Sequence, residues 1–165
     1  MRLNRGWIES HIPHQGRMCL LDEVLDWETD RIRCASGGHG SPDHPLRAHG
    51  RLGIACGIEI AAQTMAVHGA LSAAGALSAA GTLSAAGADN RPRAGLLAGV
   101  RSVRMYAARL DDVRADLVCE ATRMAGDAGG ALYEFELSSA GSTLMRGRAT
   151  VVLDASDPRA RGWST

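Results

Sequence analysis

The second half of the chain alternates between apolar and polar residues with a period of two. The clearest case is residues 131–138, in which the apolar side chains are Ala131, Tyr133, Phe135 and Leu137. The same alternation recurs in residues 116–122 and 148–153, while residues 31–35 and 96–107 are apolar enough for strands. Consecutive alternating segments joined by short glycine-rich turns predict an antiparallel sheet with one packed face and one wet face.

Residues 54–68 have a different pattern, because IACGIEIAAQTMAVH is apolar or small on nearly every side of a helix. Such a pattern is typical of a buried helix. Its polar positions include Glu59 and Gln63, which lie one turn apart on the same face. The packed face of the sheet needs a cover, and this helix can supply it. The expected fold class is therefore α+β, an antiparallel sheet wrapped around a central helix.

The remaining segments suggest how the domain is divided. Residues 36–53 are rich in Gly, Pro and His without periodicity, and so long a loop is usually functional or disordered. Residues 69–88 repeat the unit G-[AT]-L-S-A-A, which is too short for a solenoid and predicts a frayed helix or flexible linker without chemistry. We expect a single domain over residues 1–153, with this repeat inserted after the helix, and a polar tail over 154–165.

Composition excludes several classes of function. The 165 residues carry no formal net charge. This argues against a function that depends on strong electrostatic attraction to nucleic acid or to a membrane surface. All 18 basic residues are arginine, so chemistry that needs a protein lysine is excluded. The four cysteines form no CxxC pair, and reduced thiols in a cytoplasmic protein are the default expectation. Neither a G-x-S-x-G motif nor a dinucleotide-binding G-x-G-x-x-G after a strand is present.

Glu59 is the leading candidate for chemistry, since a carboxylate on a buried helix is costly unless it is paired or protonated. Burial raises the pKa of a carboxyl group, which predicts a proton donor near neutral pH. The alternative is a side chain that reaches solvent at the helix end. Among the six histidines, His39, His44 and His49 fall at five-residue spacing in the loop. They could hold a metal, supply a general base, or be solvated.

Two segments resemble a known family. IPHQGRMCLLDEVLDW is similar to the N-terminal signature of the β-hydroxyacyl-[acyl carrier protein] dehydratases of the hot-dog fold, and GIEIAAQTMAVHG to their central helix. His44 lies fifteen residues before Glu59, close to the family's His-to-Glu spacing. HPLR, GIE-x-AAQ-x-MAVHGAL and the ending GRATVVL more closely resemble dehydratase-like proteins of aryl-polyene and related fatty-acid-like clusters.

This resemblance implies a hot-dog fold that dimerises, with a site built from His of one chain and Glu of the other. The implied substrate is an acyl thioester on the phosphopantetheine arm of an acyl carrier protein. His44 would remove the α-proton and Glu59 would protonate the β-hydroxyl, with no cofactor and no metal. The implied substrate-binding residues are Gly53 and Gly57 at the helix N-terminus, together with Gln63 and His49.

Other functions remain open on the sequence. A thioesterase of the same fold would use Glu59 to activate water, and a non-catalytic subunit would pair with an active dehydratase. The chain could accordingly form a homodimer or a heterodimer. An acidic carrier protein would dock on arginines near the tunnel mouth, and the candidates are Arg47, Arg51, Arg91, Arg93, Arg101 and Arg104.

Overall fold

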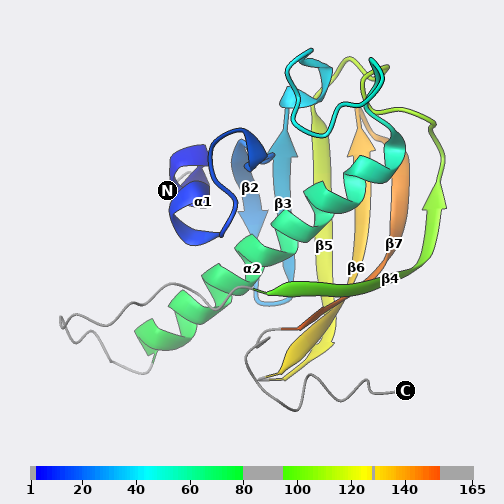
Figure 1. Cartoon of the computed structure of the whole chain (residues 1–165). Coiled ribbons are helices and arrows are strands. Elements are labelled where there is room, and N and C mark those ends of the chain that lie inside the picture. Colours follow the sequence, from blue (N-terminus) through cyan, green and yellow to red (C-terminus); the bar gives the residue numbers. More distant parts are fainter. Residues whose placement is uncertain (1–2, 80–94, 128, 153–165) are drawn as a thin grey trace, which may run out of the picture.

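The computed structural model describes residues 3–79, 95–127 and 129–152. One antiparallel sheet with the strand order β1-β2-β3-β5-β6-β7-β4 curves around the long helix α2 (Figure 1). The strands are β1 (Leu3–Asn4), β2 (Glu23–Trp27), β3 (Arg31–Ser36), β4 (Leu96–Met105), β5 (Leu117–Gly126), β6 (Gly130–Ser139) and β7 (Ser142–Val152). The helices are α1 (Arg5–His11), α2 (Gly57–Ala79) and the short 3-10 turns Gly16–Met18, Gly38–Gly40 and Ile54–Cys56. The expected α+β class and the hot-dog architecture are confirmed.

The strands β5, β6 and β7 form the meander that the alternating pattern predicts. Along β6 every second side chain is buried, so one face packs and the other is wet. Ala140 and Gly141, both with positive φ, close the tight turn between β6 and β7. Glycine adopts this left-handed conformation at little cost, which explains its place in the turn.

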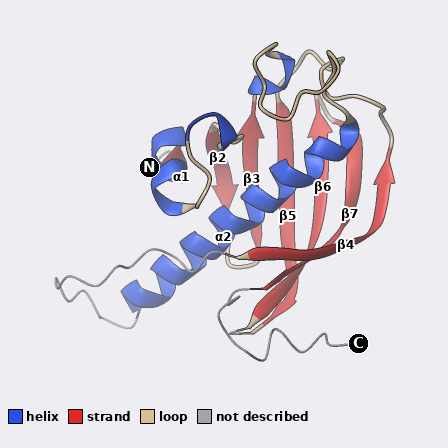
Figure 2. Cartoon of the chain, viewed as in Figure 1, coloured by secondary structure: helices blue, strands red, loops and turns tan. Residues whose placement is uncertain are grey.

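Helix α2 lies across the concave face of the sheet (Figure 2). Its first residue, Gly57, faces the sheet so closely that an added Cβ would lie 2.7 Å from both Leu137 and Met145. Ile60, Met65 and Val67 on the same helix are almost fully buried. An apolar helix sunk into a curved sheet supplies the single core that the sequence pattern requires.

The loop between β3 and α2 is held by one buried carboxylate. Asp111, in the connection between β4 and β5, accepts hydrogen bonds from the Leu52 backbone N–H at 3.1 Å and from Arg109 Nε at 3.0 Å. It also forms an ion pair with Arg47 at 2.9 Å. The Arg109 guanidinium and the Leu52 N–H hold the pKa of Asp111 well below its usual range. These contacts tie the loop that carries His44 to the body of the sheet.

Helix α1 was not apparent from the sequence pattern. Asn4 caps its N-terminus by accepting from the Trp7 backbone N–H at 3.1 Å, and Ile8 inserts into the core. With one buried residue in seven, the helix has too little periodicity to be recognised. It places residues 12–18 against α2.

Strand β4 forms one edge of the sheet and pairs with β7 alone. Its register shifts between Leu97 and Gly99 and again between Arg101 and Arg104, and the strand bends around the concave side (Figure 1). Nearly all of its residues are exposed, and the exposed apolar side chains include Leu96, Leu97 and Val100.

The repeat begins inside α2, which extends to Ala79. Its first residues therefore belong to the central helix. Residues 80–94, which contain the later units, and the tail from residue 153 lie outside the described residues. The prediction of a mobile repeat remains a prediction there.

Candidate active site

A cavity of about 800 Å³ opens along one side of α2. Its helical wall is made mostly of small residues that share one face of α2, among them Ala62, Ala66, Gly69, Ala70 and Ala73. The opposite wall comes from Tyr133 and Val151 on the sheet and from Leu96 and Leu97 at the start of β4. Gly69 and Ala70 open the repeat, so its first unit lines the cavity. The expectation that the repeat carries no chemistry remains a prediction.

Glu59 lies at the wall of this cavity on the first turn of α2. Its Oε1 atom is 2.9 Å from His14 Nε2 and accepts a hydrogen bond from Gln63 Nε2 at 3.0 Å. The hydrogen bond from His14 lowers the pKa of Glu59, burial opposes it, and the bond from Gln63 adds to the lowering. The expectation of a raised pKa was therefore wrong, because donated hydrogen bonds outweigh burial.

Gln63 holds this arrangement in place. It is fully buried, and its Nε2 donates to the Met18 carbonyl at 2.8 Å as well as to Glu59. Its Oε1 accepts from the Leu20 backbone N–H at 2.8 Å. Because its side chain forms these three hydrogen bonds, Gln63 holds α2 against the segment before β2 and orients the carboxylate of Glu59. Its expected contact with substrate remains a prediction.

His14 was not singled out from the sequence, although it stands in the IPHQGRM segment that resembles a family signature. It lines the cavity and contacts Glu59 through Nε2, while its Nδ1 atom is buried without a hydrogen-bond partner among the described residues. The resemblance to that signature was the only available signal, since His14 and Glu59 are far apart in sequence.

His44 lies in the loop before α2 and does not line this cavity. It is buried, and its Nδ1 accepts a hydrogen bond from the Leu46 backbone N–H at 3.2 Å. Burial lowers the pKa of His44, and the nearby His39, Arg47 and Arg17 lower it further. Within one chain the structure brings Glu59 and Gln63 together with His14, not with His44.

The other expected site residues surround the start of α2. Gly53 caps the 3-10 turn that leads into the helix, and Gly57 packs against the sheet. His49 is exposed and has a positive φ of 50°. His39 is buried, with Nε2 2.9 Å from the Val113 carbonyl oxygen. No cluster of potential metal-ligating side chains occurs among the described residues.

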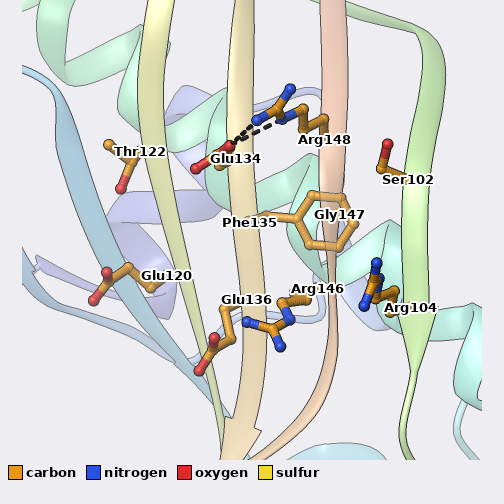
Figure 3. A pocket seen from close by; sticks show the side chains of 10 residues that line it. All are labelled: Ser102, Arg104, Glu120, Thr122, Glu134, Phe135, Glu136, Arg146, Gly147 and Arg148. Atoms are coloured by element: carbon orange, nitrogen blue, oxygen red, sulfur yellow. Dashed lines mark hydrogen bonds and ion pairs between the residues drawn. The ribbon is translucent and has the colours of Figure 1, made fainter.

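A second hollow is lined mainly by charged side chains of β5, β6, β7 and β4 (Figure 3). Arg148 forms an ion pair with Glu134 at 2.7 Å, and Arg146 donates to the Tyr106 hydroxyl at 2.8 Å. Arg104 lies beside them on β4 (Figure 3). Paired and exposed charges of this kind are typical of a solvated sheet face, so the apolar cavity is the better candidate for an active site.

Comparison with known proteins identifies the family. A family model described as ApeP dehydratase, of the ApeP-like type, matches residues 7–160. The chain is similar to a solved structure of the dehydratase heterocomplex ApeI:P from Xenorhabdus doucetiae, with a TM-score of 0.73 and 20% identity over 93% of this chain and 95% of that chain.

More distant structures share the fold. A cysteine-to-alanine variant of an HP0420 homologue from Helicobacter felis has a TM-score of 0.57 and 10% identity over 93% of this chain and 89% of that chain. A hypothetical thioesterase with coenzyme A from Streptococcus pneumoniae has a TM-score of 0.52 and 10% identity over 80% of this chain and 84% of that chain. No curated protein matches the chain significantly.

Proposed function

Because the chain belongs to the ApeP-like dehydratase family, we propose that it removes water from a 3-hydroxyacyl thioester carried by an acyl carrier protein. The product is the trans-2-enoyl thioester. The observation that carries this proposal is Glu59, an acid–base group at the wall of a large cavity with an otherwise mostly apolar lining. A cavity of this form suits an acyl chain, and the carboxylate suits proton transfer at its reacting carbons.

His44 and Glu59 are the proposed catalytic residues. In a homodimer they would meet across the subunit interface, whereas in a heterodimer each would face a residue of the related subunit. Within one chain His44 is not part of the cavity wall, so a second subunit is needed to bring such a histidine to Glu59. The exposed apolar edge strand β4 supports pairing with another subunit. The similar ApeI:P structure is a heterocomplex, which supports a related dehydratase subunit as the partner.

An acidic carrier protein is the proposed substrate donor. Arg101 and Arg104 are exposed on β4 and available to it, whereas Arg47 is already paired with Asp111. Arg51 is exposed in the loop, and Arg91 and Arg93 lie outside the described residues. Reversing the charge of Arg101 and Arg104 should weaken the salt dependence of turnover if the carrier protein docks there.

The test is incubation of the purified protein, alone and with its cognate dehydratase-like subunit, with a 3-hydroxyacyl carrier-protein thioester. Mass spectrometry should show loss of one water, and Glu59→Gln should lower the rate by about 10² to 10⁴. Release of the free acid would instead indicate a thioesterase. Full activity of the Glu59→Gln complex would assign the chemistry to the partner and leave this chain as a non-catalytic subunit.

A further inference from the structure

We propose that Gly69, the first residue of the repeat, determines how long an acyl chain the cavity accepts, because its missing side chain leaves the path along α2 open. The inference rests on the proposed function and narrows its substrate class to thioesters of long, extended acyl chains. It follows from the position of Gly69 on the helix, the space around it and the lining of the cavity.

The first observation is the position of Gly69 in the row of small residues on α2. Ala62, Ala66, Gly69 and Ala73 follow one another at intervals of three or four residues, and all four line the cavity. Residues at this spacing share one face of a helix. An acyl chain that runs along this face from Glu59 therefore passes Gly69 before it reaches Ala73.

The second observation is the open space at Gly69. Apart from the helix backbone around it, no heavy atom of the described residues lies within 4 Å of the place where a Cβ would stand. At Gly57 on the same helix a Cβ would lie 2.7 Å from two side chains. Gly57 is thus required by packing, whereas Gly69 is not, and glycine inside a helix is less stable than alanine. What Gly69 provides is width in the cavity.

The third observation is the lining of the cavity toward the end of α2. Leu96 and Leu97 at the start of β4 line the cavity, and they are 54% and 38% exposed. An apolar chain laid against them would remove this apolar surface from water. The charged Arg123 and Asp127 also line the cavity, and Ala73 is exposed, so the helical wall meets solvent there.

Helix geometry converts these positions into chain length. Gly69 follows Glu59 by ten residues. At 1.5 Å per residue this is about 15 Å along the helix axis. An extended chain with C–C bonds of about 1.52 Å advances about 1.25 Å per carbon. A substrate whose Cβ lies beside Glu59 therefore reaches Gly69 about twelve carbons further on.

Leucine substitutions at two positions on this face test the inference. The purified protein, alone and with its related subunit, is loaded with a fluorescent fatty acid, which is displaced by saturated fatty acids of increasing length. In the original protein affinity should rise with each added methylene up to about sixteen carbons. Gly69→Leu, whose side chain leans back toward Glu59, should weaken binding of the sixteen-carbon chain by roughly 10- to 200-fold.

The position of the substitution should set the length at which binding fails. Gly69→Leu should tolerate chains up to about twelve carbons, and Ala66→Leu, three residues nearer to Glu59, should reach its limit about four carbons earlier. Because the added side chain at Gly69 enters open space, Gly69→Leu should keep the Tm of the original protein or exceed it.

Two variants are controls. Gly69→Ala makes the same change of helix propensity with a single methyl group, so it should shift the limit less than leucine does. Ala74→Leu adds leucine at an exposed position that does not line the cavity, and it should leave every affinity unchanged.

Three results would overturn the inference: an equal loss at every chain length in Gly69→Leu, no loss at any length, or an original protein whose affinity does not rise with chain length. None of them depends on the chemistry. Length limits without loss of water from a 3-hydroxyacyl thioester would refute the proposed function and keep the role of Gly69, whereas dehydration without length limits would do the reverse.

Discussion

At the scale of single residues, the protonation of Glu59 depends on which groups surround it. Burial alone would favour the neutral acid, and about two thirds of the Glu59 side chain is shielded from solvent, since 32% is exposed. The hydrogen bonds from His14 and Gln63 act in the opposite direction and dominate. The donated hydrogen bonds thus hold the pKa of Glu59 below its usual value in spite of burial.

The proposed catalytic role of His44 predicts that two substitutions have similar effects. Neither His44→Gln nor His44→Ala keeps a group that titrates near neutral pH, so each should lower kcat by about 10² to 10⁴ if the imidazole transfers a proton. The rates are measured on the complex that shows dehydration. Activity that is nearly retained in His44→Gln and lost in His44→Ala would mean that His44 supplies a hydrogen-bond donor and transfers no proton.

At the scale of elements, α2 both carries the carboxylate and shapes the cavity. The small residues that follow Glu59 along one face leave room that larger side chains would fill. Ala66→Leu should lower kcat/KM at least tenfold for long acyl chains and leave four-carbon chains nearly unaffected, since a few methylenes in an apolar pocket change binding by roughly 10- to 200-fold. Rates are compared across a chain-length series.

The matched control for this substitution is Ala74→Leu, on the same helix at an exposed position that does not line the cavity. It adds the same side chain to α2, so it should change neither long-chain nor short-chain turnover. A uniform loss in Ala66→Leu for every chain length would mean that the helix is distorted rather than that the cavity is shortened.

The loop before α2 depends on Asp111, and its contribution to stability varies with pH. Because the pKa of Asp111 is lowered in the folded protein, its contribution is complete above the unfolded value, about 3.9, and is lost as pH falls toward the folded value. Asp111→Asn should lower Tm at pH 7, and the difference from the original protein should shrink below about pH 4. Calorimetry at several pH values measures this difference.

Asp112→Asn serves as the comparison, because Asp112 is 68% exposed and its carboxylate lies 3.5 Å from Arg109. Exposed pairs contribute little, so its Tm should hardly change. A Tm difference for Asp111→Asn that stays constant through the acid range would rule out ionisation of this carboxyl as its cause.

At the scale of the whole molecule, the sheet has an open edge at strand β4. Strand β4 has ten residues, pairs on one side, and exposes several apolar side chains, including Leu96 at 54%. Open edges of this kind invite pairing with another chain. We expect the assembled protein to be a two-fold or pseudo-two-fold dimer that covers this edge.

Val100→Asp should therefore weaken assembly, because it places a charge on the exposed part of β4. Light scattering should show a smaller mass at the same concentration, or the related subunit should no longer co-purify. Leu25→Asp is the control: Leu25 is 42% exposed on β2, near the opposite edge of the sheet, and its change should leave the mass unaltered. A protein that is monomeric in isolation and in the presence of its partner would contradict the prediction.

The local pattern of the sequence alone determined several strands, the central helix and the family of this protein. Period-two alternation is a property of neighbouring residues, so β6 could be located from sequence to within one residue at each end and β5 to within four. The end of β7 was also located, but the strand begins at Ser142, six residues before the alternating segment 148–153. The uninterrupted apolar run before and after Glu59 likewise identified the central helix and its carboxylate. The order of short motifs was enough to indicate the hot-dog fold and the dehydratase family, which the family match to residues 7–160 confirms.

Tertiary structure decided what distant residues do to one another. His14 reaches Glu59 only because α1 and the following turn pack on α2, and α1 itself contributes a single buried residue, Ile8, that no periodicity reveals. Whether β4 is central or at an edge depends on its pairing, which its composition does not encode. The pKa of Glu59 was also decided by tertiary structure. The burial of its helix is predictable from the sequence, but the hydrogen bonds that lower the pKa come from contacts that only the folded chain makes.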